Sequence, residues 1–285
     1  MTNGLGKIII ISGATASGKS ALALEIAHKR NGVIINSDAM QLYSELPILS
    51  AQPSEDDLKK FPHFLYSVLK HNEKSSVMSW IYMAKNKIDE TLASGKTPIV
   101  VGGTGLYISK LIDGINKVPQ IDEGLKQEVR DLVDDLSRDE IIEILTALKD
   151  NYDDIANLDK QRLGRRLEVL KQTGKTLSWW QKQPNETFYP QEYFEHIKTD
   201  LPRDVLYKNC DDRLEFMFKN GAIDEVQELM KQGVKADSLI TKTIGFLEIK
   251  DYLENRIGLS EALKTAQQKT RNYAKRQLTW FRHQF

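Results

Sequence analysis

One stretch of this sequence has the residue types and spacing needed to bind phosphate groups: Gly13, Ala14, Thr15, Ala16, Ser17, Gly18, Lys19 and Ser20. It matches the template G-x-x-x-x-G-K-[ST] at every fixed position. In such a loop, successive backbone N–H groups and the positive end of a helix dipole surround an anion. Lys19 adds a positive charge, and the Ser20 hydroxyl is placed to hold a Mg²⁺ ion that bridges phosphate oxygens. The motif therefore predicts a bound di- or triphosphate, without saying which bond of that molecule breaks.

The residues around the phosphate loop fit the strand–turn–helix geometry that it needs. Residues 7–12 form a β-branched run that predicts a buried strand, and residues 21–27 are rich in helix formers. Residues 32–36 predict a second buried strand, whose carboxyl end lies beside the loop, where open α/β sheets bind ligands. Asp38 follows this strand. Two interpretations of it stay open: a helix N-cap, or a functional carboxylate that ligates Mg²⁺ or acts as a general base.

A second Gly-rich turn, residues 102–105, follows a third predicted strand at residues 98–101. This turn either approaches the same ligand or makes a tight connection to the next helix. Many P-loop ATPases carry an acid at the end of a neighbouring strand, and the absence of one here argues against a simple ATPase. We also expect strands at residues 64–69 and 194–199, and helices at residues 77–93, 206–219, 222–231 and 260–282.

The character of the sequence changes between residues 119 and 190, where strand patterns give way to charged helical ones at residues 125–136 and 139–148. In residues 159–170, three leucines share one helical face, while Arg162 and Arg166 share another, with Arg165 nearby. We interpret this as a basic face turned toward a ligand; a solvated arginine face is the alternative. The fold class predicted is α/β: a P-loop NTPase-like parallel sheet flanked by helices, formed by residues 1–118 plus 194–285, with an all-α insertion domain at 119–193.

Composition excludes several classes of protein. The 285 residues carry no formal net charge, 40% are hydrophobic, and Cys210 is the single cysteine. One cysteine excludes an internal disulfide and a cysteine-cluster metal site, and it fits a reducing compartment. The first apolar run ends in the phosphate loop, and no run approaches membrane-spanning length. We therefore expect a cytoplasmic protein that does not contact membranes.

Charge is distributed unevenly along the chain. Residues 119–159 contain thirteen acids and four basic residues, whereas residues 262–285 contain six basic residues and no acid. On a helix, Lys264, Arg271, Lys275 and Arg282 would form one narrow stripe. A basic stripe without acids to pair it is typical of a nucleic-acid-backbone contact.

Together these motifs resemble those of the tRNA dimethylallyltransferase (tRNA isopentenyltransferase) family. The resemblance rests on the phosphate loop and on four further segments in the family's order, at residues 37–43, 101–107, 159–175 and 275–282. It runs from Gly13 to Arg282. The chain departs from the family at residues 47–53, Pro-Ile-Leu-Ser-Ala-Gln-Pro, where the family usually reads Asp-Ile-Gly-Thr-Ala-Lys-Pro.

The resemblance implies transfer of the dimethylallyl group of dimethylallyl diphosphate to N6 of adenosine 37 in tRNA, with release of diphosphate. It implies Asp38 and Thr15 as catalytic residues, residues 13–20 as the diphosphate or nucleotide site, and Mg²⁺ on Ser20. We expect a monomer that contacts the tRNA anticodon stem-loop. The implied contacts are Asp38, Ala39, Met40, Gln41, Thr104, Gln161, Arg162, Leu163, Gly164, Arg165, Lys242, Lys275, Arg276, Gln277 and Arg282.

Three other functions stay open on the sequence alone. A P-loop small-molecule kinase would use Arg162, Arg165 and Arg166 as lid arginines. A relative that prenylates free AMP would not need the basic C-terminal helix. An RNA-binding nucleotide switch would bind tRNA and release no diphosphate.

Overall fold

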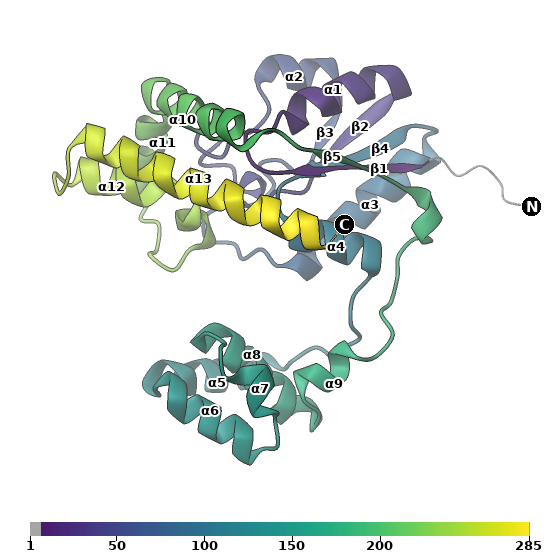
Figure 1. Ribbon diagram of the computed structural model, residues 1–285, viewed down its shortest axis with the longest axis vertical. Coiled ribbons are helices and arrows are strands. Elements are labelled where there is room, and N and C mark those ends of the chain that lie inside the picture. Colours follow the sequence, from purple (N-terminus) through teal and green to yellow (C-terminus); the bar gives the residue numbers. More distant parts are fainter. Residues whose placement is uncertain (1–6, 285) are drawn as a thin grey trace, which may run out of the picture. The chain divides into compact units, whose positions relative to one another are not determined.

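The computed structural model describes residues 7–284 and divides them into two compact units (Figure 1). The larger unit comprises Met1–Ile112 and Phe188–Phe285, and the smaller one comprises Asp113–Thr187. The smaller unit therefore begins and ends six residues before the range 119–193 expected from sequence. The reason is local pairing: the backbones of Ile115 and Glu186 exchange two hydrogen bonds, at 3.1 and 2.9 Å, which joins both linkers to the helical unit.

The larger unit is built on a five-stranded parallel sheet in the order β3-β2-β4-β1-β5. Every residue of β1 and β2, the two strands on either side of β4, is buried, as expected when helices cover both faces of a parallel sheet. Their carboxyl ends lead directly into the phosphate loop and to Asp38. The strands are β1 (Ile8–Gly13), β2 (Gly32–Asn36), β3 (His63–Phe64), β4 (Thr97–Gly102) and β5 (Phe194–Thr199).

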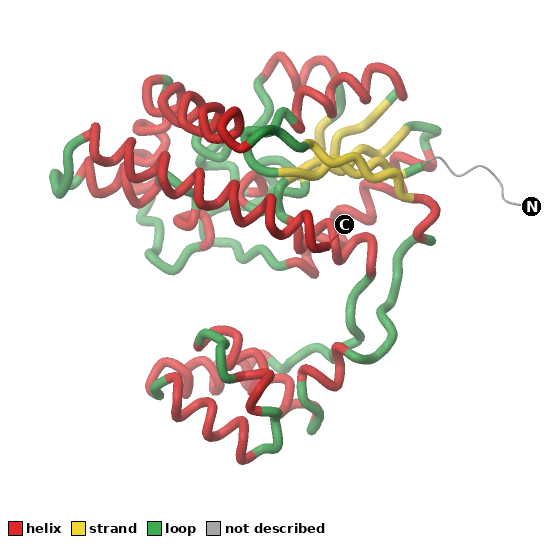
Figure 2. The backbone as a smooth tube through the Cα atoms, in the orientation of Figure 1, coloured by secondary structure: helices red, strands yellow, loops and turns green. Residues whose placement is uncertain are grey.

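Helices α1 and α3 lie on opposite faces of this sheet (Figures 1 and 2). Ala23 and Ala27 of α1 pack against Ile9 and Ile34, and small residues there allow the helix to approach the strands closely. On α3, the apolar residues of the sheet-facing side, such as Trp80 and Ile88, are fully buried. Trp80 Nε1 donates to the carbonyl of Asn36 at 2.8 Å. The helices in this half are α1 (Lys19–Arg30), η1 (Met40–Leu42), α2 (Glu55–Lys60), α3 (Val77–Ala93) and α4 (Gly105–Asp113).

A layer of C-terminal helices completes the larger unit. Helix α13 packs against both α10 and α12, and α10 and α13 run side by side in Figure 2. Leu206 and Cys210 of α10 and Ala274 of α13 form one cluster with Ala14 of the phosphate loop. The C-terminal helical layer therefore packs directly against the phosphate loop. Its elements are η2 (Gln191–Tyr193), α10 (Arg203–Lys219), α11 (Ala222–Lys231), η3 (Leu239–Lys242), α12 (Phe246–Leu253) and α13 (Leu259–Gln284).

The smaller unit is all-helical and has its own core. Val129 and Val133 from one helix, Ile141 and Leu145 from the next, and Leu167 from a third are buried together. The helices are α5 (Glu123–Asp135), α6 (Arg138–Ala147), α7 (Tyr152–Ile155), α8 (Lys160–Thr173) and α9 (Leu177–Gln181). Within residues 7–284, no helix has both the length and the apolar composition that would let it cross a membrane.

One predicted element is much shorter than expected. The strand predicted at residues 64–69 is only the two-residue β3, His63–Phe64. Leu65 and Ser67 adopt positive φ angles of 64° and 52°, which break the extended backbone that a strand requires. By contrast, the helix predicted at residues 77–93 and the strand predicted at residues 194–199 have the observed bounds.

Candidate active site

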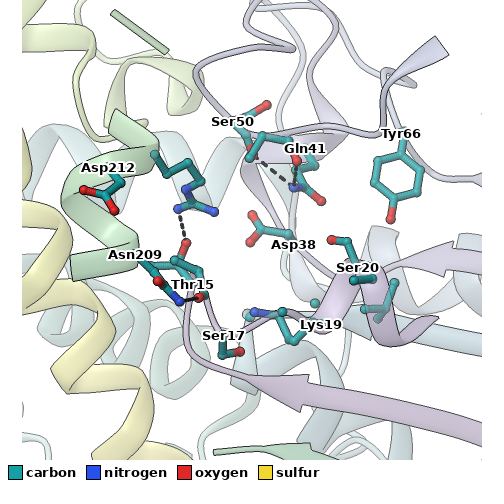
Figure 3. Close-up of a pocket in the computed structure, with 18 residues that line it drawn as sticks. Thr15, Ser17, Lys19, Ser20, Asp38, Gln41, Ser50, Tyr66, Asn209 and Asp212 are labelled. Carbon is teal, nitrogen blue, oxygen red and sulfur yellow. Dashed lines mark hydrogen bonds between the residues drawn. The ribbon is translucent and has the colours of Figure 1, made fainter. Parts of the chain in front are cut away.

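The phosphate loop opens into a cavity of about 460 Å³ at the carboxyl end of the sheet (Figure 3). The loop connects β1 to α1, and the first-turn N–H groups of α1 are donors without partners in the helix itself. Phosphate-loop residues, Asp38 and three polar side chains of α10 surround the cavity. The lining comprises Thr15, Ala16, Ser17, Gly18, Lys19, Ser20, Ala21, Asp38, Gln41, Ser50, Ala51, Tyr66, Val101, Gly102, Gly103, Asn209, Asp212 and Arg213.

Asp38 extends into this cavity on the side facing the phosphate loop (Figure 3). The buried amide of Asn36 fixes its backbone: Oδ1 accepts from the N–H of Asp38 at 2.7 Å, and Nδ2 donates to its carbonyl at 2.9 Å. One carboxylate oxygen accepts from the N–H of Met40 at 3.1 Å, which forms a local turn; the N-cap of the short helix that follows is Ala39, so the N-cap interpretation of Asp38 is wrong. The carboxylate lines the cavity, where the charges of Lys19 and Arg213 act on it.

Two cationic side chains, Lys19 and Arg213, act on the Asp38 carboxylate. Burial raises the pKa of Asp38, while the N–H of Met40 and the charge of Lys19 oppose part of that rise. Burial also lowers the pKa of Lys19 to about 8, against the opposing attraction of Asp38. Lys19 Nζ donates to the carbonyl of Ala14 at 2.6 Å, within its own loop. The site thus holds a carboxylate with increased basicity opposite a positive charge suited to a phosphate.

Arg213 is a cavity-lining residue that the sequence analysis did not identify. It lies on α10 and donates from Nη2 to Oγ1 of Thr15. Within the described residues, its buried Nε has no hydrogen-bond partner, which is the arrangement of a guanidinium prepared for an anion. The signal was present in the sequence: Arg213 follows the buried Leu206 and Cys210 at helical spacing, so a charge occurs on the apolar face of its helix.

Gln277 of α13 joins the phosphate loop to the second Gly-rich turn. Its Oε1 accepts from the N–H of Thr15 at 2.8 Å, and its Nε2 donates to the carbonyl of Gly103 at 2.9 Å. A Cβ at position 103 would lie 2.3 Å from Nε2 of Gln277, so a side chain there would displace the amide of Gln277. The second turn therefore both lines the cavity and makes a tight connection.

Comparison with known proteins decides the family. The family model described as "IPP transferase" matches residues 41–284, and a second, "Isopentenyl transferase", matches residues 6–67. The chain belongs to the IPP transferase family. Its similarity to the tRNA dimethylallyltransferase of Rickettsia bellii is 46% identity over 98% of this chain and 88% of the relative. The enzyme of the same name from Rickettsia felis is 42% identical over 98% of this chain and 90% of its own.

Solved structures of the IPP transferase family share the fold. The tRNA isopentenylpyrophosphate transferase of Bacillus halodurans superposes with a TM-score of 0.68 at 30% identity, covering 97% of this chain and 86% of the other. A eukaryotic dimethylallyltransferase, described as acting on tRNA, superposes with a TM-score of 0.82 at 28% identity, covering 96% and 69%. The expected resemblance to this family is confirmed.

The residues expected to contact tRNA fall into three groups in this member of the IPP transferase family. Seven side chains are exposed and are available to a partner: three on α8, one on η3 and three on α13. They are Gln161, Arg162, Arg165, Lys242, Lys275, Arg276 and Arg282. The second group lies in the loop that follows β2 and contains Asp38, Ala39 and Met40. Thr104 lies beside this loop, and its Oγ1 accepts from the N–H of Ala39 at 3.0 Å.

Four of the expected tRNA contacts have other structural roles. Leu163 and Gly164 form the buried face of α8, because that face packs against α5. Gln277 is buried and uses both ends of its amide, as described above. Gln41 lines the cavity and donates from Nε2 to the carbonyls of Ser50 and Ala51, at 2.9 and 2.8 Å.

Two expected basic surfaces are smaller than predicted, since acids from neighbouring elements pair them. Arg166 is buried and makes a two-pronged ion pair with Asp150, at 2.6 and 2.7 Å, so it belongs to the core of the smaller unit. Arg271 pairs with Asp211 of α10 at 2.5 Å, which interrupts the stripe on α13. Sequence spacing along one helix could not show these partners.

The donor set at the phosphate loop fits Mg²⁺ bound through a substrate. Within residues 7–284, no group of three or more His, Cys, Asp or Glu side chains is arranged to hold a metal by itself. Mg²⁺ is commonly bound by one or two protein oxygens together with substrate phosphates and water. Ser20, which lines the cavity, provides an oxygen of this kind.

Proposed function

We propose that this chain transfers the dimethylallyl group of dimethylallyl diphosphate to N6 of adenosine 37 in tRNA and releases diphosphate. The observation that carries this proposal is that Asp38 and the phosphate loop share one cavity. A base and a site for the leaving group on opposite sides of a cavity are what a transfer from a diphosphate to an amine requires. The named relatives, which are tRNA dimethylallyltransferases at 41–46% identity, give the acceptor class.

The chemistry balances with the residues present. The N6 lone pair forms a bond to C1 of the allyl group while the C1–O bond breaks, and its electron pair leaves on diphosphate. Asp38 accepts the proton released from N6; such a base typically contributes about 10²–10⁴-fold to the rate. Lys19, Arg213 and the loop N–H groups stabilise the negative charge that develops on the leaving oxygen.

Thr15 is oriented as a donor to the leaving oxygen. Its hydroxyl oxygen already accepts a hydrogen bond from Arg213, so its own proton is left to donate. The backbone N–H of Thr15 donates to Oε1 of Gln277. When bound, Mg²⁺ would be held by Ser20 and would neutralise further phosphate charge. We propose Mg²⁺ as the cofactor on this basis.

The acceptor amine must leave its base stack to reach the cavity. Bases in single-stranded anticodon loops can be extruded at a cost of about a few kcal/mol. The exposed basic residues of α8 and α13 provide contacts to the RNA backbone. A tRNA substrate also leads us to expect the enzyme in the cytoplasm, and we keep the prediction of a monomer.

A transfer assay tests the proposal against its alternatives. Protein, Mg²⁺ and labelled dimethylallyl diphosphate are mixed with an unmodified anticodon stem-loop, with AMP, or with ATP and small acceptors. We expect label in the RNA and an equal amount of released diphosphate. Label in AMP alone would show the free-nucleotide reaction, and ATP turnover without label transfer would show a kinase.

A further inference from the structure

The loop at residues 47–52 forms part of the cavity wall through Ser50 and Ala51. It is a compact turn: the N–H groups of Ser50, Ala51 and Gln52 donate to carbonyls three to five residues earlier, each at 2.9 Å. Ala51 adopts a positive φ of 59°, an unfavourable conformation for a residue with a Cβ. Contacts from outside the loop must therefore hold this shape.

Those contacts come from α11, more than 170 positions further along the chain. The carboxylate of Glu225 accepts from the N–H of Ile48 at 2.6 Å and from the N–H of Leu49 at 3.0 Å. The side chains of the same two residues lie against glycines at the starts of α11 and α12. A Cβ at Gly221 would lie 2.9 Å from Ile48 Cδ1, and one at Gly245 would lie 2.8 Å from Leu49 Cδ1.

The other end of the loop is held by Gln41, whose amide donates to the carbonyls of Ser50 and Ala51. The loop is thus capped like a short helix, with a carboxylate on its N–H groups and an amide on its carbonyls. Only the carboxylate cap comes from outside the sheet region. It links the C-terminal helical layer to the cavity wall.

We propose that Glu225 is a positioning residue for the allyl diphosphate, acting through the loop at residues 47–52. The proposal rests on the function proposed above. Glu225 does not line the cavity, so its effect reaches the substrate through Ser50 and Ala51. Burial raises the pKa of Glu225, and the N–H groups of Ile48 and Leu49 oppose that rise, as expected for a carboxylate whose role is to bind backbone N–H groups.

The expected kinetic signature is a change in KM for the allyl diphosphate rather than in kcat. If the loop is released, only a fraction of molecules has the complete cavity, and the apparent affinity falls by that fraction. Once the donor is bound, the loop is in place, and Asp38, Thr15 and Lys19 are unchanged. A hydrogen bond to a charged group is strong enough for its loss to raise KM about tenfold.

The test compares Glu225→Gln with Glu228→Gln on the same helix. Glutamine at 225 keeps one acceptor but turns an NH₂ group toward a backbone N–H of the loop. Glu228 is exposed and pairs with Lys231 at the surface, so its variant is the matched control. We expect KM for dimethylallyl diphosphate to rise about tenfold in Glu225→Gln, with kcat and KM for the tRNA stem-loop within about twofold of wild type.

Two further measurements keep the result interpretable. Glu225→Asp retains the charge with a shorter reach, and we expect it to restore part of the lost affinity. Hydrogen exchange should become faster at the amides of Ile48 and Leu49 in Glu225→Gln, while exchange in β1 and β4 stays slow. If Glu225→Gln does not fold, Glu225→Asp carries the test with the same expected direction.

The outcomes separate this inference from the proposed function. If wild type transfers label to RNA but Glu225→Gln has the same donor KM as Glu228→Gln, the positioning role is wrong and the function stands. A fall in kcat with unchanged KM would also overturn it. If wild type transfers no label to RNA, the proposed function fails, and calorimetric binding of dimethylallyl diphosphate to the two variants still tests the loop directly.

Discussion

The backbone N–H of Thr15 donates to Oε1 of Gln277 across 2.8 Å, although the two residues are 262 positions apart in the sequence. The other end of the same amide donates to the carbonyl of Gly103. One side chain of α13 thus fixes the phosphate loop and the second Gly-rich turn relative to each other. The motif that indicated an RNA contact at Gln277 instead supports the active site.

We predict that Gln277→Met destabilises the protein by about 2–4 kcal/mol, because a buried N–H and a buried carbonyl both lose their partners. Chemical denaturation measures this, and Gln268→Met, on the exposed face of the same helix, should change stability by less than about 0.5 kcal/mol. If Gln277→Met weakened RNA binding while leaving stability intact, Gln277 would be an RNA contact after all.

We predict that kcat/KM for dimethylallyl diphosphate falls as the pH rises through about 8, because Lys19 then loses the charge that binds phosphate. Its pKa in the folded enzyme lies below that of a free lysine, so the loss begins at lower pH than for an exposed lysine. On the acid side, activity should fall at a higher pH than an ordinary aspartate gives, since the pKa of Asp38 is raised.

Lys19→Arg provides the control for the alkaline limb. Arginine keeps its charge throughout this range, so the fall near pH 8 should disappear even if the overall rate is lower. An unchanged alkaline limb in Lys19→Arg would assign that pKa to another group.

The smaller unit offers a matched pair of arginines. Arg166→Met leaves Asp150 buried without its partner, and we predict a loss of about 3–5 kcal/mol in unfolding free energy. The side chain of Arg162 is 71% exposed, so Arg162→Met should have an unfolding free energy within about 0.5 kcal/mol of wild type. The second variant should instead weaken tRNA binding and reduce the salt dependence of log K by about one unit.

Thermal unfolding and stem-loop binding at several salt concentrations separate these roles. A loss of stability in Arg162→Met would contradict its assignment as an exposed RNA contact. Unchanged tRNA affinity in Arg162→Met, together with weaker tRNA binding by a folded Arg166→Met, would reverse the roles of the two arginines.

The sequence predicted the parts of the site that depend on local order. The phosphate loop, the strand before it and Asp38 after the next strand lie within forty residues, and β-branched runs and glycines specify their geometry. The helix at residues 77–93 was also predictable, because its capping serine and its apolar spacing are both local.

The parts that were missed depend on contacts between distant segments. Arg213 and Glu225 act on residues more than 170 positions earlier, and helical periodicity alone does not identify such partners. The same limit explains the charged residues that were misassigned. From the sequence, Arg166 and Arg271 were interpreted as unpaired basic residues. In the folded protein, Arg166 pairs with Asp150, and Arg271 pairs with Asp211.

The most direct test of the central claim is single-turnover transfer by Asp38→Asn. Asparagine keeps the oxygen that accepts from Met40 N–H, so the loop should retain its shape, but it cannot take a proton from N6. We predict that the rate of label transfer to the stem-loop falls about 10²–10⁴-fold, with binding of dimethylallyl diphosphate within a few-fold of wild type. A rate near wild type at saturating donor and RNA would contradict Asp38 as the base.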